Sequence, residues 1–183
     1  MVIICYILEM KERDDWLFAE RNKKDVLTSL DCYVEKVGLK VVEKDYEKPW
    51  GGYVKFDFNE ADKFAEKFFN DIKNELDFNL KMSPKFLLVA PGERLSWQYH
   101  FKRSEVWRVV EGVVGIKLNN TDEEPEEVIR YKEGDLIEIK RMVRHRLAGL
   151  GNWGLVAEIW IHNDKNDLSD EDDIVRLQDN YGR

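Results

Sequence analysis

The 183-residue chain has only two cysteines, four prolines and three histidines. Cys5 and Cys32 have neither zinc-finger spacing nor the density of a secreted disulfide scaffold, so we expect reduced thiols in a cytoplasmic protein. No apolar run reaches the roughly 18 residues of a membrane-spanning helix, so no membrane partner is expected. Residues 2–8 are apolar, but no basic residue precedes them and charged residues follow at once. They are predicted to form a first strand and not a signal peptide, with Met10 as an alternative start.

The charge balance of the chain is acidic. Lys and Arg number 29 against 37 Asp and Glu, which gives a formal net charge of −8 and a pI near 5.1. Proteins that bind nucleic acid need a basic face that displaces counterions, so no nucleic-acid partner is expected. Basic residues nevertheless gather in two short stretches, 94–108 and 141–146. Such local positive charge suits a phosphorylated small molecule, although arginine on a water-exposed strand is equally ordinary.

Residues 1–80 carry mixed patterns. Residues 11–30 are compatible with one helix or two short ones, and residues 37–42 with a strand. A clearer helix is predicted to begin with Asn59 as its cap, because apolar residues recur at four-residue spacing from Phe64 to Leu76. The sequence therefore predicts a helical and mixed N-terminal extension over residues 1–80.

Residues 81–183 are predicted to form the β core of the same single domain, 1–183. From Lys85 onward, short apolar stretches alternate with turns rich in Pro, Gly and Asn, which is the spacing of a β-sandwich or barrel. The acidic stretch 122–127 is predicted to be a solvated loop. Acidic residues between Ser169 and Ile174 predict the start of a short C-terminal helix, where carboxylates meet free backbone amides.

Four polar residues have the types and spacing of metal ligands. Gln98, His100 and Glu105 fall within eight residues, and His145 follows later. Imidazole, carboxylate and amide oxygen are groups that bind a divalent cation. Gln98 and His100 are two apart and share a strand face, and the gap before Glu105 allows a turn onto a neighbouring strand. The plainer alternative is a set of buried polar side chains that only satisfy hydrogen bonds. Taken together, the four residues favour a metal site in which the first three ligands come from one hairpin.

The spacing of these residues resembles the two motifs of the cupin superfamily. The first motif matches Gly92 to Gly112, with Gln98 in place of the first histidine, and the second runs from Gly134 to His145. A ligand set of glutamine, histidine, glutamate and histidine is similar to that of phosphomannose isomerases. The resemblance implies a mainly β fold, a cupin jelly-roll barrel with the N-terminal helical extension and the short C-terminal helix. It also implies a divalent metal, with Zn²⁺ favoured.

A closer resemblance is to the type II phosphomannose isomerases, which also form the C-terminal domain of bifunctional mannose-1-phosphate guanylyltransferases. Four stretches match that family in order: Pro49–Tyr53, Pro91–His100, Arg103–Trp107 and Glu171–Arg183. Several positions depart from the motifs. Lys140 and Met142 replace a usual proline and glycine, Val106 replaces a histidine, and Trp160 and His162 replace glutamine and glycine. The last three changes are expected to alter the substrate.

The resemblance implies reversible isomerisation of mannose 6-phosphate and fructose 6-phosphate through an enediol. A bound metal would polarise the substrate carbonyl and ease removal of the C2 proton. Glu158 is the expected base and Arg176 a catalytic cation over the sugar. The expected substrate-binding residues are Ser96, Arg103, Trp107 and Trp160. As alternatives, Glu158 forms only an ion pair and a metal-bound hydroxide acts as the base. Arg176 forms only a surface salt bridge, and the tryptophans only pack in the core.

Other functions stay open at this point. The same site could isomerise a different sugar or sugar phosphate, or it could bind a sugar without catalysis. A metal oxygenase is disfavoured by Gln98, because such enzymes prefer nitrogen ligands or a two-histidine and carboxylate face. Guanylyltransferase activity is not expected, because no glycine-rich nucleotide loop is present. The expected partner is a small-molecule sugar phosphate, with a homodimer through an edge strand as a further possibility.

Overall fold

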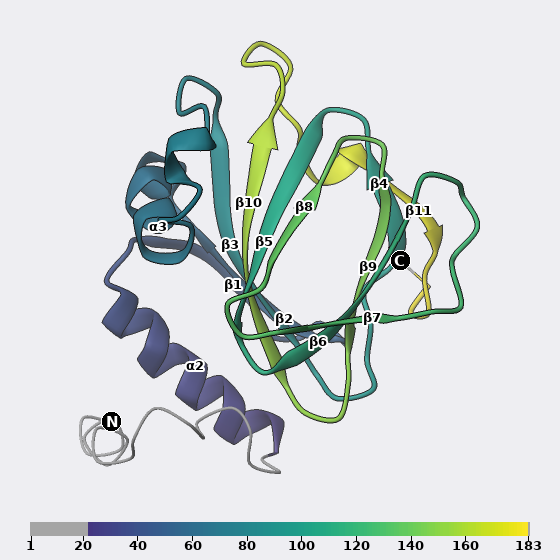
Figure 1. Cartoon of the computed structure of the whole chain (residues 1–183). Helices are drawn as coiled ribbons and strands as arrows, with labels where there is room; N and C mark the ends of the chain where they lie inside the picture. The colour runs from purple at the N-terminus through teal and green to yellow at the C-terminus, as the bar shows by residue number, and fades with distance from the viewer. Residues whose placement is uncertain (1–21, 183) are drawn as a thin grey trace.

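Two antiparallel β-sheets form most of the protein, whose computed structural model describes residues 22–182 (Figure 1). One sheet has the strand order β1-β2-β3-β10-β5-β8, and the other β11-β4-β9-β6-β7. The strands of the first sheet are β1 Val41–Asp45, β2 Gly51–Phe56, β3 Met82–Val89, β10 Gly154–His162, β5 Arg103–Glu111 and β8 Leu136–Ile139. Those of the second are β11 Ile174–Gln178, β4 Trp97–His100, β9 Arg144–Gly149, β6 Val113–Asn119 and β7 Ile129–Lys132.

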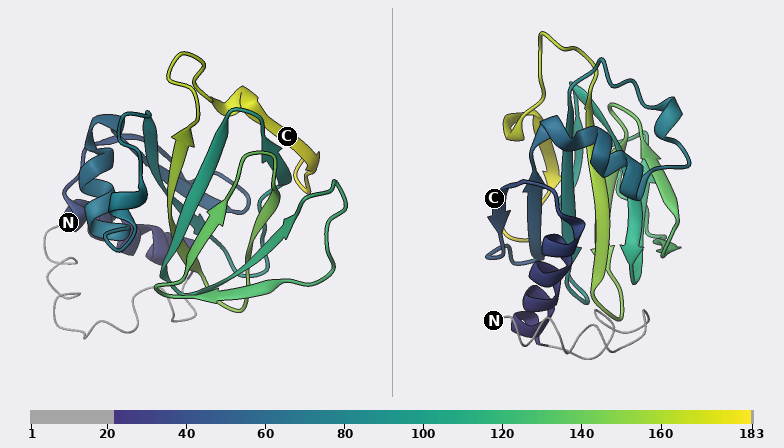
Figure 2. Two further views of the ribbon diagram at one scale, coloured as in Figure 1. Left: turned by 45° about the horizontal axis from the view of Figure 1, so that its top comes forward. Right: turned by 90° about the vertical axis from the view of Figure 1, so that its left-hand side faces the viewer.

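The six-stranded sheet buries apolar side chains on both of its faces. Its inner face packs against the five-stranded sheet, where Leu87 and Val156 meet Ile116 and Leu147 in one core cluster. Side chains alternate along a strand, so the neighbouring residues face the other way. That outer face is covered by α2 (Lys23–Val37) and α3 (Ala61–Phe68), as Figure 2 shows. The mainly β, cupin-type architecture is thus confirmed, as two facing sheets without a closed barrel among the described residues.

Helix α2 is the longer of the two helices that cover the outer face of the six-stranded sheet. Asn22 caps it by accepting a hydrogen bond from the backbone of Asp25 at 3.1 Å, and Gly38 ends it with a φ of 69°. Cys32, on this helix, is disulfide-bonded, which corrects the expectation of reduced thiols. The predicted strand over residues 2–8 and the alternative start at Met10 lie outside the described residues. Within residues 22–182 we find no helix with the length and apolar character needed to cross a membrane.

Helix α3 is shorter than the sequence pattern predicts. Asn59 belongs to a preceding 3-10 turn, Phe58–Glu60, which is capped by Asp57. The α-helix ends at Phe68, and a second 3-10 turn, Lys73–Glu75, precedes Leu76. Short polar side chains at residues 70–71 compete for backbone hydrogen bonds and disfavour a helix interior there. The predicted helix from Asn59 to Leu76 was therefore wrong at both ends.

The C-terminal segment is mainly a strand. The predicted helix is one 3-10 turn, Glu171–Asp173, and Ile174–Gln178 then pairs with β4, with Arg176 opposite Gln98. The β-branched residues after the turn favour the extended backbone. The segment therefore closes the edge of the five-stranded sheet beside two predicted metal ligands.

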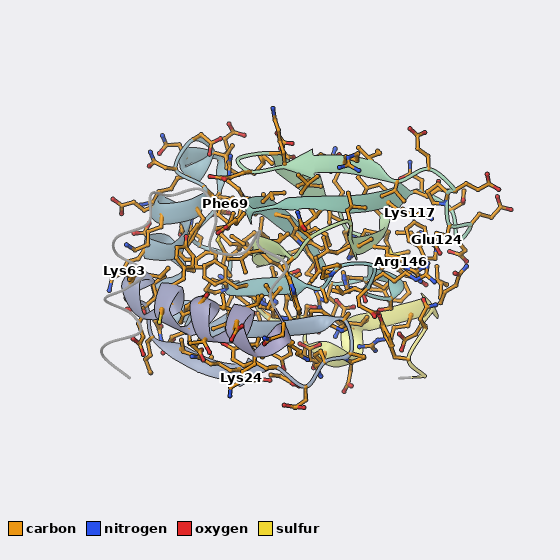
Figure 3. The ribbon with its side chains drawn as sticks, turned by 90° about the horizontal axis from the view of Figure 1, so that it is seen from below. Lys24, Lys63, Phe69, Lys117, Glu124 and Arg146 are labelled. Carbon is orange, nitrogen blue, oxygen red and sulfur yellow. The ribbon has the colours of Figure 1, made fainter. Side chains whose placement is uncertain are left out.

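The acidic loop at residues 122–127 is bound to the sheet surface more tightly than predicted. Glu124 is paired with Arg146 at 2.8 Å and with Lys117 at 3.0 Å, and its side chain is only 11% exposed (Figure 3). Asp122 pairs with Arg144 at 2.5 Å. The basic stretch 141–146 is thus partly neutralised within the protein.

Candidate metal centre

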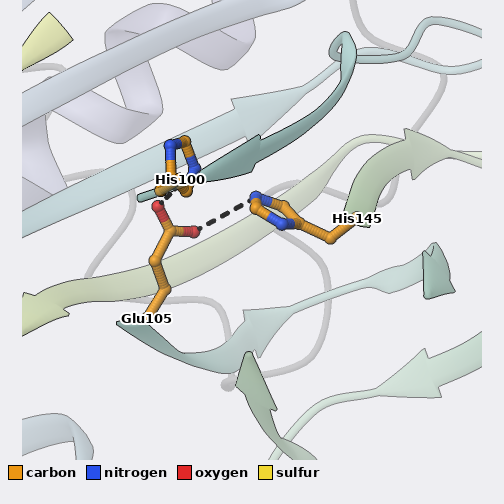
Figure 4. A group of neighbouring side chains, drawn as sticks. All are labelled: His100, Glu105 and His145. Carbon is orange, nitrogen blue, oxygen red and sulfur yellow. Dashed lines mark ion pairs between the residues drawn. The ribbon is translucent and has the colours of Figure 1, made fainter. Parts of the chain in front are cut away.

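Three of the four predicted ligands converge at one end of the space between the sheets. His100 lies on β4, Glu105 on β5 and His145 on β9, and one candidate ligand atom from each lies within 4.8 Å of the others (Figure 4). The Nε2 atom of His100 lies 3.1 Å from Oε1 of Glu105, and Nε2 of His145 lies 3.5 Å from Oε2. All three side chains are buried.

The ligands reach this point from two different sheets. We predicted that β4 and β5 form one hairpin, but β4 belongs to the five-stranded sheet and β5 to the six-stranded sheet. The turn at Phe101 and Lys102 carries the chain across from one sheet to the other. His100 and Glu105 therefore face each other across the interior, an arrangement that allows a cation to be enclosed between them.

The His145 imidazole is already in the form that a metal requires. Its Nδ1 lies 3.0 Å from the carbonyl oxygen of Val143, which can only accept a hydrogen bond, so Nδ1 carries the proton. Nε2 then holds a lone pair, and this buried atom has no hydrogen-bond partner among the described residues. Burial lowers the pKa of His145 to about 4, although Glu105 opposes the shift. A neutral imidazole with a free lone pair is the metal-binding state.

Glu105 is held as an anion by its neighbours. Burial alone would raise the pKa of Glu105, but His100 and the permanent charge of Arg103 hold it well below its usual range. Its two oxygens accept hydrogen bonds from Nε of Arg103 at 2.9 Å and from Nε1 of Trp107 at 3.1 Å. These two bonds leave lone pairs on both oxygens and orient the carboxylate.

The donor set fits a divalent cation such as Zn²⁺. Two imidazoles and a carboxylate within 4.8 Å match its preferred ligands, and the buried Nε2 of His145 has no hydrogen-bond partner among residues 22–182. Gln98 pairs with His145 across β4 and β9, and its amide oxygen accepts a hydrogen bond from Ser96 at 2.5 Å. The Gln98 side chain therefore lies on the same face of the sheet as that of His145, with its amide oxygen held by Ser96.

A cavity of about 300 Å³ adjoins the cluster. Its wall includes Gln98 and Glu105 and all six residues predicted for catalysis or substrate binding: Ser96, Arg103, Trp107, Glu158, Trp160 and Arg176. Their roles stay predictions, but they lie around one space. Four of these side chains come from the adjacent antiparallel strands β10 and β5, where Glu158 lies opposite Trp107 and Trp160 opposite Glu105. Residues two apart on a strand, and residues directly opposite on its neighbour, point to the same face of the sheet.

Arg103 is embedded in the wall and not extended into the cavity. It is 1% exposed, and its Nη1 donates to the hydroxyl of Ser169 at 2.7 Å and to the carbonyl of Asp170 at 3.0 Å. Its Nη2 lies 3.3 Å from Nε2 of His100, and its guanidinium stacks 3.4 Å from the centre of the Trp160 ring. Arg103 thus links two candidate ligands to the C-terminal segment.

Glu158 is a buried carboxyl group that faces the cavity. Its Oε2 has no hydrogen-bond partner among the described residues and lies 3.7 Å from Nζ of Lys85, its cross-strand neighbour on β3. Burial, followed by the charge of Glu105, raises the pKa of Glu158 to about 8, against the effect of Lys85 and Arg103. Such a perturbed group beside a candidate metal centre is typical of a functional site.

Only one of the three departures expected to alter the substrate reaches the cavity. Trp160 lines it, whereas Val106 packs on the outer face of the sheet, in the core cluster beneath the helices. His162 lies between the hydroxyl of Ser83, 2.9 Å from its Nε2, and the backbone N–H of Ser169, which donates to its Nδ1. The side chain of Val106 therefore points away from the cavity, and the expectation that these changes alter the substrate stays a prediction.

Sequence reasoning missed two residues around this site. Lys85 lines the cavity although it is 5% exposed, and Asp173 holds the turn between β4 and β5. A signal existed for Lys85, because it is the one charged residue in the largely apolar strand Met82–Val89. Asp173 had no such signal, since the backbone groups that it binds in this turn lie 72 and 71 residues earlier in the sequence.

Comparisons with known proteins agree with the motifs. Residues 69–179 match the family model described as mannose-6-phosphate isomerase C-terminal. A mannose-1-phosphate guanylyltransferase of Salmonella montevideo is 30% identical over 97% of this chain, which covers 32% of that protein. The alginate biosynthesis protein AlgA of Pseudomonas aeruginosa is 31% identical, again over 97% of this chain and 31% of its own length. The chain therefore spans about a third of these relatives.

The fold is also similar to solved structures. Oxalate decarboxylase from Bacillus subtilis superposes with a TM-score of 0.52 and 14% sequence identity, covering 74% of this chain and 30% of that chain. At this identity the likeness speaks for the fold alone, and it agrees with the two-sheet architecture.

Proposed function

Since the chain belongs to the mannose-6-phosphate isomerase C-terminal family, we propose that it interconverts mannose 6-phosphate and fructose 6-phosphate with the help of a divalent metal. The observation that carries this proposal is that a cluster of metal-ligand side chains and a buried carboxyl group with a raised pKa lie at one cavity. The curated relatives are named for guanylyl transfer or polysaccharide biosynthesis, and this chain covers only about a third of them.

In this proposal, His100, Glu105 and His145 hold the metal, and the amide oxygen of Gln98 completes the set. When bound, a divalent cation such as Zn²⁺ polarises the carbonyl of the open-chain sugar and stabilises the negative charge that develops on its oxygen. Arg103 keeps the Glu105 carboxylate oriented through its 2.9 Å hydrogen bond. The 3.0 Å hydrogen bond of His145 to Val143 fixes which ring nitrogen faces the cluster.

Glu158 moves the proton. Aldose–ketose isomerisation moves the C2 proton to C1 and the hydroxyl proton on O2 to O1, and one group beside C1 and C2 can both take and release the carbon proton. A carboxyl group whose pKa is about 8 exchanges protons readily near neutral pH, and the unpartnered Oε2 leaves a free atom for the substrate. The surrounding indoles of Trp107 and Trp160 exclude water and strengthen the local electrostatic interactions.

The test combines metal analysis with a coupled assay on mannose 6-phosphate. We expect the parent protein to carry about one divalent metal ion per chain and to turn over, and His100→Ala to lose both while remaining folded. His162→Asn is the matched control, because it removes the third histidine, which lies outside the cluster; metal content should be retained. Full activity of a metal-free His100→Ala variant contradicts the proposal.

A second candidate is the isomerisation of another sugar in the same cavity. Trp160 favours it, since this departure from the family motif forms part of the wall. A panel of aldose and ketose phosphates and free sugars separates the two candidates by kcat/KM. Tight sugar binding without turnover of any member, in a metal-loaded protein, indicates a non-catalytic binding protein instead.

A further inference from the structure

Lys85 occupies a position that the folding of the sheet alone does not explain. It lies on β3 with its side chain on the inner face, in register with Glu158 on β10, and only 5% of the residue is exposed. A buried lysine costs stability unless it is well paired. Its ammonium group forms two ion pairs, with Glu158 at 3.7 Å and with Glu171 at 3.5 Å, and both are longer than a typical hydrogen bond.

The ammonium group is held in place by aromatic rings. It lies 3.7 Å from the centre of the Trp160 ring and 5.3 Å from that of Tyr53. Ring faces attract a cation without using its hydrogen-bond donors. Lys85 donates no hydrogen bond to any described residue. Its three N–H groups are therefore available to a ligand in the cavity.

The other cations of the cavity wall are less suited to bind an anion inside it. The guanidinium of Arg103 is engaged by Glu105, Ser169 and the backbone. Arg176 is exposed at the rim, and Lys48 pairs with Asp45 at 2.9 Å. Lys85 is therefore the buried cation of this wall whose donors remain open.

The spacing between Lys85 and the metal ligands matches an elongated substrate. β3 and β5 both flank β10, so the backbones of Lys85 and Glu105 are separated by two strand spacings across the sheet, together about 10 Å, and by two residues along the strands, about 7 Å. An open hexose with its C1 and C2 at the metal cluster would extend its sixth carbon toward β3. Trp160, in register with Glu105 and stacked with Lys85, lies between the two ends.

We infer that Lys85 binds the phosphoryl group of a hexose phosphate whose carbonyl end lies at the metal cluster. This inference rests on the proposed function and assigns its specificity for a phosphorylated substrate to one residue. Glu171 has a side chain that is 58% exposed and would turn toward solvent when the phosphoryl group takes its place beside Lys85. Lys85 is then a binding residue, separate from the proton transfer by Glu158.

Direct binding tests the inference without requiring turnover. Calorimetry compares mannose 6-phosphate, inorganic phosphate and mannose on the metal-loaded parent and on Lys85→Met, which keeps an unbranched apolar chain against Trp160. We expect affinity for both phosphate-containing ligands to fall about 10- to 100-fold, the effect of losing a charge-assisted hydrogen bond, and affinity for mannose to be unchanged. Lys85→Arg should retain most of the affinity. The matched control is Lys55→Met, the neighbour of Lys85 across β2 and β3, which should bind like the parent.

Two results overturn the inference. The first is a folded, metal-loaded Lys85→Met variant that binds mannose 6-phosphate with the affinity of the parent. The second is an equal loss of affinity for mannose and for mannose 6-phosphate, which would assign Lys85 to binding the sugar or to the fold. If Lys85→Met does not fold, the test is the NMR resonance of the Lys85 ammonium group in the parent protein. This resonance is expected to shift when inorganic phosphate is added, and an unchanged resonance also rejects the inference. If phosphate binds through Lys85 but no sugar phosphate is isomerised, the proposed reaction fails and this site stands.

Discussion

The carboxylate of Asp173 accepts a hydrogen bond from the backbone N–H of Phe101, 72 residues earlier in the chain, at 3.0 Å. The same carboxylate accepts the next N–H, that of Lys102, at 3.1 Å, and the hydroxyl of Ser169 at 2.6 Å. Phe101 and Lys102 form the turn that separates His100 from Glu105. The C-terminal segment therefore determines how two candidate metal ligands are spaced.

Weakening this contact is expected to loosen the metal site. Asp173→Asn replaces one acceptor oxygen with an amide group that cannot accept the N–H of Lys102. We expect metal affinity to fall about tenfold, as is typical when a group that orients metal ligands is changed. Competition with a metal-binding dye measures it. Asp172→Asn, an exposed neighbour, is the control, and equal metal affinities for the two variants speak against the role of Asp173.

Glu158→Gln separates proton transfer from metal binding. The amide keeps the size of the side chain but cannot take a proton, so kcat for mannose 6-phosphate should fall about 10²- to 10⁴-fold with metal content unchanged. Glu138→Gln is the control, because Glu138 is exposed and pairs with Val106, on the opposite face of the same sheet. An unchanged kcat in a folded, metal-loaded Glu158→Gln protein would assign the base to another group.

His162 should make the protein sensitive to acid. Burial, assisted by Lys81 and Arg103, lowers the pKa of His162 to about 4 in the folded protein. The unfolded chain binds the proton first, near pH 6.5, so the stability from a neutral His162 is present above that pH and is lost as the pH falls toward about 4. His162→Asn should therefore lose less free energy of unfolding than the parent between about pH 7 and pH 4.5, as measured by urea unfolding. A loss as large as that of the parent contradicts this assignment.

Met142 is expected to be a site of backbone strain. Its φ of 68° lies in the left-handed region, at the position where the second cupin motif usually has glycine. A side chain there costs about 1–2 kcal/mol, and glycine removes this cost while adding some chain entropy to the unfolded state. Met142→Gly should raise the free energy of unfolding by about 1 kcal/mol. Met142→Ala keeps a Cβ and should show no such gain, and a gain of the same size would mean that strain is not the cause.

Local patterns predicted which side chains share a face wherever the residues lie on one strand. The two-residue spacing of Gln98 and His100, and the shared parity of Glu158 and Trp160, follow from the alternation of side chains along a strand. Helix boundaries were predicted less well, as α3 and the C-terminal 3-10 turn show. Those boundaries depend on short polar residues and on packing partners that the repeating apolar pattern does not contain.

By itself, the sequence determined the ligand types, the strand faces that carry them and the family motifs, because these depend on residue chemistry and on the short-range geometry of the backbone. Tertiary structure alone decided that β4 and β5 approach from opposite sheets, that Val106 points away from the cavity, and that Lys85 lies two strands from Glu105. It also set the pKa of Glu158, because desolvation and charge–charge interactions depend on neighbours that are distant along the chain and close only after folding.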